Sequence, residues 1–69
     1  MTIATALADL NTSVANLTGA INALLLGAAT NGTDIAASLS TISALIETEV
    51  ANVNNVTVSV AAVPNNINT

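Results

Sequence analysis

The sequence contains no cysteine, histidine, lysine, arginine or aromatic residue. The missing cysteine excludes a disulfide and a thiolate metal site, and the missing histidine removes the commonest metal ligand and general base. Without cations or aromatic rings, the chain has no side chain that could neutralise phosphates or stack on bases. We therefore expect a non-enzymatic protein with no cofactor, no metal and no nucleic-acid partner.

Only four side chains can ionise, namely Asp9, Asp34, Glu47 and Glu49. Paired carboxylates can serve as general acid and base, and the two glutamates are close in sequence. Residues two apart on a helix point to different faces, however, so these two do not converge on a substrate. We interpret all four carboxylates as solvating and capping groups.

Large aliphatic residues are abundant, with 21 Leu, Val and Ile among 69 residues. A domain of this size has a small core, so an isolated chain cannot bury all of them. We predict that the chain forms a homo-oligomer or packs on a partner.

Residues 3–24 carry an unbroken repeat of aliphatic side chains that are alternately four and three residues apart, the spacing of a coiled-coil seam. The members at heptad position a are Leu7, Val14 and Ile21, and those at position d are Ile3, Leu10, Leu17 and Leu24. The flanking residues are small and uncharged, which predicts pairing by close packing that is insensitive to salt. An amphipathic helix inside a single globular domain is the alternative.

A second, shorter seam follows, with Leu39 and Ile46 at position a and Ile35 and Ile42 at position d. Its register is offset by four residues from the first, which is the size of a stutter. The first seam favours dimers, because it combines β-branched Val14 and Ile21 at position a with leucines at position d. The second seam has leucine at position a and isoleucine at position d, which favours trimers or tetramers. We predict a trimer as the compromise.

Between the seams, residues 27–33 read as a turn or joint. Gly27 suits the position that follows a helix, and Asn31-Gly32 is a strong turn signal. Thr33 or Asp34 can then cap the second helix.

This joint permits either a helical hairpin or one continuous rod. In a hairpin, Leu25 and Leu26 would pack inside the corner, whereas in a rod they would face outward. We favour the hairpin, with both leucines as candidate partner contacts.

From residue 53 onward the apolar pattern changes to a period of two. Val56, Val58 and Val60 would share one face of a strand that ends before Pro64. A single strand must pair with another copy or with a partner's sheet, so these valines are also candidate partner contacts. A helix remains possible, because four valines also have helical spacing: Val53, Val56, Val60 and Val63.

The sequence thus predicts one small, mainly α domain over residues 1–69. Its parts are a helix over 2–26, the joint over 27–33, a helix over 34–51, a short β-strand or extended segment over 53–63, and a polar tail over 64–69.

Two other classes of protein are weaker alternatives. Residues 10–33 carry no charge and are long enough to cross a bilayer, which permits a small membrane-embedded or membrane-active protein. Several asparagines lie in this stretch and no cation or aromatic residue flanks it, so a membrane role is disfavoured. The β-prone, uncharged segment 53–63 also permits a strand-donating subunit of an extracellular filament.

The helical repeat resembles those that open small virion proteins of tailed bacteriophages, over about the first 26 residues; it consists of Leu7, Leu10, Val14, Leu17 and Ile21. Such proteins include short fibre, capsid decoration and adaptor chains. The resemblance implies a trimer in which a coiled coil joins a β-rich element and attaches to a shell or tail protein. It also implies a non-enzymatic structural protein located in the virion.

Overall fold

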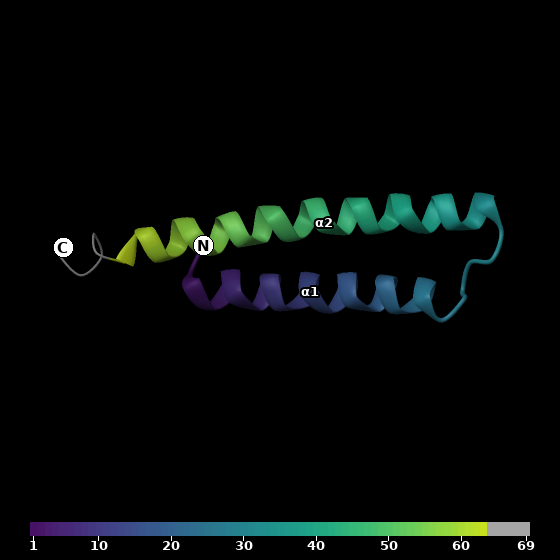
Figure 1. Cartoon of the computed structure of the whole chain (residues 1–69). Helices are drawn as coiled ribbons and strands as arrows, with labels where there is room; N and C mark the ends of the chain where they lie inside the picture. The colour runs from purple at the N-terminus through teal and green to yellow at the C-terminus, as the bar shows by residue number, and fades with distance from the viewer. Residues whose placement is uncertain (64–69) are drawn as a thin grey trace.

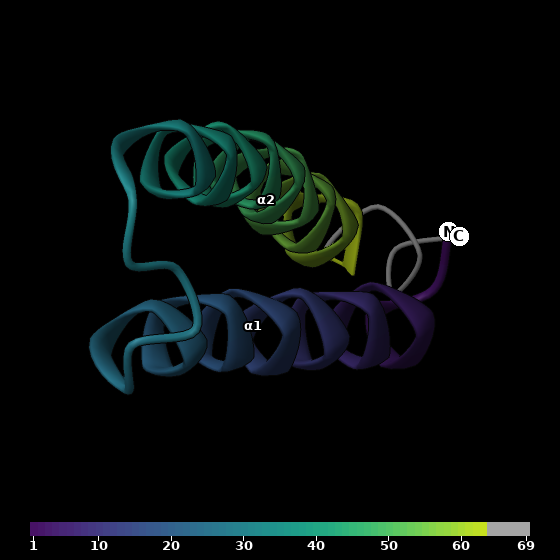
Figure 2. The same ribbon diagram turned by 90° about the vertical axis from the view of Figure 1, so that its right-hand side faces the viewer.

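A computed structural model describes residues 1–63 and shows two antiparallel helices joined by a loop. Helix α1 spans Ile3–Leu25 and helix α2 spans Gly32–Ala61. The two helices lie side by side (Figures 1 and 2), and the longer α2 reaches beyond α1 at both ends (Figure 1). The expectation of a mainly α chain with two helices is confirmed, whereas the predicted tail over 64–69 lies outside the described residues.

Helix α1 is capped at both ends. The Thr2 hydroxyl accepts a 3.1 Å hydrogen bond from a first-turn N–H. At the other end, Gly27 has a φ of 84°, and its N–H donates to the Leu24 carbonyl at 3.1 Å. The N–H of Ala28 donates to the Ala23 carbonyl at 3.0 Å, which completes a Schellman motif. The predicted role of Gly27 is therefore confirmed.

Helix α2 begins two residues earlier than predicted. Its cap is Asn31, whose side-chain oxygen accepts a 2.9 Å hydrogen bond from the N–H of Asp34. The Asn31 amide also donates to the Asp34 carboxylate at 2.7 Å. Asp34 thus supports the cap rather than providing it, and its negative charge lies at the positive end of the helix.

The prediction of a strand over 53–63 is wrong, because α2 continues through this segment to Ala61. The physical reason is packing on α1. Val56 is half-buried, and Ser59 is buried with its hydroxyl donating to the Met1 carbonyl at 3.3 Å. A β-branched residue loses less than about 0.7 kcal/mol in a helix, which such contacts outweigh. The strand-donating filament loses the feature on which it depended.

The two helices meet along a seam formed by position d and by position g, which lies three residues later. On both helices the least exposed residues follow a repeat of three and four. On α1 they are Ile3, Ala6, Leu10, Ser13, Leu17, Ala20 and Leu24; on α2 they are Ser38, Ile42, Leu45, Glu49, Asn52, Val56 and Ser59, and the row continues at Val63 beyond the end of the helix. Asn55 is also half-buried, beside this row. Because most residues at g are small, the helices can approach closely, and Ala6 is completely buried.

Candidate functional site

One side of the hairpin carries a long row of uncovered aliphatic side chains, which we call the apolar stripe. Each of its members lies at position a and is between 39% and 53% exposed. They recur every seven residues on each helix. The members are Leu7, Val14 and Ile21 on α1 and Leu39, Ile46, Val53 and Val60 on α2.

Helix geometry places both halves of the stripe on the same side of the hairpin. Two antiparallel helices that bury equivalent positions are related by a pseudo-twofold axis perpendicular to the plane of their axes. Position a follows position d by four residues on both helices, so it is displaced from the seam in the same sense. A rotation about this axis maps each side of the plane onto itself, so position a of α1 and position a of α2 lie on the same side. The α1 and α2 rows therefore flank one surface, which is aliphatic at position d except for the half-buried Glu49.

The residues of the predicted oligomer seam divide between two locations. Five are half-buried between the helices: Ile3, Leu10, Leu17, Leu24 and Ile42. Six are exposed: Leu7, Val14, Ile21, Ile35, Leu39 and Ile46. The heptad pattern thus identified residues of the buried seam and of the exposed surface together, and it did not predict which residues belong to which. The small residues at position g were missed as seam members, although their seven-residue recurrence was visible.

The other predicted contact residues are more scattered. Leu25, the last residue of α1, is 78% exposed, and the following Leu26 is 87% exposed, so the expectation that they pack inside a hairpin corner is wrong. Val58 and Val60 are exposed on α2, whereas Val56 is half-buried in the seam. The three valines share no strand face, because the segment is helical, and only Val60 belongs to the stripe.

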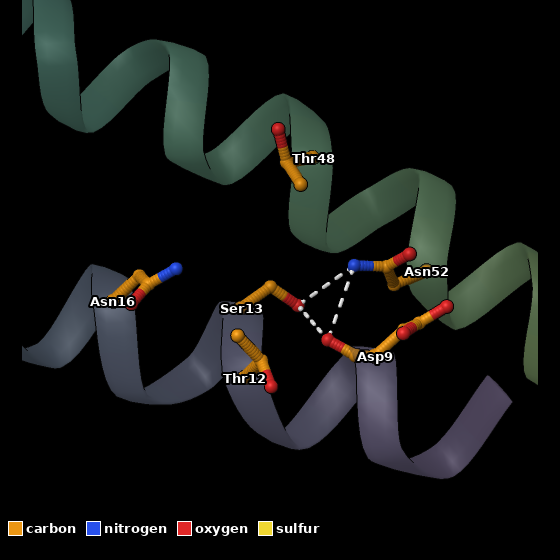
Figure 3. A pocket seen from close by; sticks show the side chains of 6 residues that line it. All are labelled: Asp9, Thr12, Ser13, Asn16, Thr48 and Asn52. Carbon is orange, nitrogen blue, oxygen red and sulfur yellow. Dashed lines mark hydrogen bonds between the residues drawn. The ribbon is translucent and has the colours of Figure 1, made fainter. Parts of the chain in front are cut away.

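The opposite side of the hairpin is polar. A shallow hollow of about 220 Å³ is lined by Asp9, Thr12, Ser13, Asn16, Thr48 and Asn52 (Figure 3). The Asn52 amide donates to the Ser13 hydroxyl at 3.0 Å and to the Asp9 carbonyl at 3.3 Å. These hydrogen bonds cross from α2 to α1, so the polar groups of this side fix the relative register of the helices.

One carboxylate departs from the interpretation that all four are solvating or capping groups. Glu49 occupies position d of α2 and is half-buried in the seam. Its Oε1 atom is buried and has no hydrogen-bond partner. The sequence signal was available, since Glu49 lies seven residues after Ile42, but a purely aliphatic pattern ends at Ile46 and omits it.

Neither a metal cluster nor a membrane-spanning helix is found in the described part of the chain. Residues 1–63 contain no group of three or more side chains suited to hold a metal ion. Neither helix in this range is long and apolar enough to cross a membrane.

Comparisons with protein-family models, with curated proteins and with solved structures found no match to this chain. The surfaces described above are therefore the basis for a functional proposal.

Proposed function

We propose that the chain is a non-enzymatic structural component of a virus particle, of the phage capsid decoration, fibre or adaptor type. It self-associates by helix packing and docks on other virion proteins. The single observation that carries the proposal is the apolar stripe, which runs along both helices and whose side chains stay about half exposed within the described residues.

The stripe supports an assembly role because of its extent and its chemistry. Contiguous apolar surface of this kind marks protein–protein contacts in soluble proteins. Its seven members include no polar or charged group, so binding there depends on shape and burial. The choice of a phage particle among possible assemblies rests on the resemblance of the α1 repeat to small virion proteins.

Particle composition tests the proposal. Particles of the virus that encodes the chain should band in a density gradient together with the chain, at a fixed ratio to the shell protein across preparations. Detection requires intact mass or cleavage after glutamate, because the sequence offers trypsin no Lys or Arg. A chain that stays at the top of the gradient, or whose ratio varies freely, would overturn the proposal.

Matched variants show whether the stripe is responsible for incorporation. Ile46→Asp places a charge within the stripe, whereas Val58→Asp places the same charge on an exposed site of α2 outside it. We expect at least a tenfold loss of the Ile46 variant from particles and normal incorporation of the Val58 variant. Equal incorporation of the two would show that incorporation does not depend on the stripe, either through self-association or through docking.

A further inference from the structure

We propose that a second copy of this chain covers the apolar stripe, so that two hairpins form a four-helix bundle. The proposal deepens the proposed function and rests on it for the biological setting. A four-helix bundle has a core made of positions a and d from every helix. Within one hairpin, position d is covered by the seam and position a is left open. A second hairpin supplies the missing half of that core.

The chemistry of the stripe indicates what its partner must offer. A matching surface must be uncharged, aliphatic and repeated every seven residues along two helices. The stripe itself meets these conditions, and an isologous twofold contact requires a surface that is complementary to itself. By their heptad positions, Asp9 and Asp34 lie on the polar side and Glu47 lies on the outer face of α2. Pairing through the stripe therefore keeps these three carboxylates away from the contact, whereas Glu49 stays half-buried at position d between the two rows of the stripe.

The available area is also sufficient. Seven aliphatic side chains that are about half exposed present on the order of 600 Å² per chain, so two copies would bury about 1,200 Å², the lower bound for a specific interface. The column beside the stripe adds small uncharged residues that extend the contact, such as Ala4, Ala36 and Val50. The paired stripes therefore reach the size of a stable dimer.

The placement of polar residues favours two copies over the trimer predicted from the sequence. A trimer with a central bundle of α1 helices and each α2 directly outside its own α1 requires an apolar face of α1 opposite the seam. That face carries Thr5, Thr12 and Asn22, all of which are exposed. The uncovered aliphatic surface lies instead on one flank of the seam, which one further hairpin can close.

Sedimentation equilibrium of the full chain tests the proposal, with interference detection because the chain has no aromatic residue. We expect a species of twice the 6.8 kDa chain mass. Val14→Asp and Ile46→Asp should weaken dimerisation by at least about 1,000-fold, because each dimer would bury two unpaired charges. The matched controls Leu26→Asp and Val58→Asp lie outside the stripe and should change it less than about threefold.

A milder pair of variants covers the case in which the aspartate variants unfold. Val14→Ala and Ile46→Ala introduce the best helix former and no charge, so far-UV circular dichroism should show retained helix at high concentration. Each should weaken dimerisation by about tenfold or more, because every dimer contains two shortened side chains and loses the aliphatic groups that they would bury. A monomeric or trimeric wild type would overturn the proposal, as would alanine variants that dimerise like wild type.

The results separate this inference from the proposed function. A wild-type chain that is monomeric in isolation yet incorporated into particles through the stripe would mean that another virion protein covers it; the dimer would then be wrong and the structural role right. A chain that dimerises through the stripe but never accompanies particles would mean the reverse, with the dimer right and the virion role wrong.

Discussion

At the scale of single residues, polar side chains between the helices fix how α1 and α2 align. Asn52 is the clearest case, because its amide reaches both the Ser13 hydroxyl and the Asp9 carbonyl across the seam. Leucine recurs at position d in Leu10 and Leu17, so aliphatic packing alone distinguishes poorly between registers one heptad apart, whereas these hydrogen bonds form only in the observed register. The apolar residues therefore supply attraction, and Asn52 supplies register.

Replacement of this asparagine tests its role. Asn52→Ala should lower the free energy of unfolding by about 1 kcal/mol relative to Asn54→Ala, because only the first change removes hydrogen bonds between helices. Asn54 is exposed on the same helix, so it matches the gain in helix propensity from alanine. Urea unfolding followed by circular dichroism measures both. Equal stabilities would show that the bridge contributes nothing.

Glu49 is the opposite case, a seam residue whose polarity is unfavourable where it lies. Its buried Oε1 atom has lost water without gaining a partner. Glu49→Leu should therefore raise the free energy of unfolding by about 1 kcal/mol, since an unsatisfied buried polar atom costs of that order. Glu47→Leu, two residues away on an exposed site, is the control. A Glu49 variant less stable than that control would contradict the account.

Sequence reasoning identified the aliphatic residues correctly but not the small and polar members of the seam. Ala6, Ser13 and Ser59 are the three buried residues among positions 1–63. None is large enough to register in a search for aliphatic periodicity. What buries them is the approach of the partner helix, and the position of that helix is a property of the folded hairpin.

At the scale of secondary-structure elements, replacing glycine by alanine should change stability in opposite directions at two sites, because the two glycines have different backbone conformations. Gly27 has a φ of 84°, where an alanine is strained, whereas Gly19 is inside α1 with no atom within 4 Å of an added Cβ. Gly27→Ala should lower the free energy of unfolding by about 1 kcal/mol and Gly19→Ala should raise it by about 1 kcal/mol. Thermal unfolding of both variants would reveal the signs. Changes in the same direction would mean that one of these backbone conformations is misassigned.

The element boundaries show where local sequence signals are enough and where they are not. Thr2 and Gly27 are local signals, and both ends of α1 follow from them. The end of α2 does not, because the valines after residue 53 fit a strand and a helix about equally. Contact with the start of α1, through Ser59 and Val56, selects the helix. That contact joins segments far apart in the sequence and has no local signature.

At the scale of the whole molecule, the balance between intramolecular and intermolecular packing is the feature that sequence reasoning left open. The two aliphatic seams could belong to a rod or a hairpin, and each seam contains both surfaces. Closing the hairpin half-buries most of position d between α1 and α2 and leaves position a about half exposed. In the proposed dimer, a second copy covers the half-exposed row from Leu7 to Ile21.

Ionic strength tests whether packing alone holds a second copy on the apolar stripe. The chain has no Lys, Arg or His and a net charge of −4, so two copies repel and no side-chain ion pair can hold them together. The packing itself is insensitive to salt, so raising NaCl from about 20 mM to about 500 mM should preserve the dimer and, by screening the repulsion, strengthen it by no more than about threefold. Asp9→Asn removes one negative charge from each copy and should reduce the rise. A dimer that weakens as salt is added would require an attraction between opposite charges, which the side chains of this sequence cannot provide, and would contradict assembly through the apolar stripe.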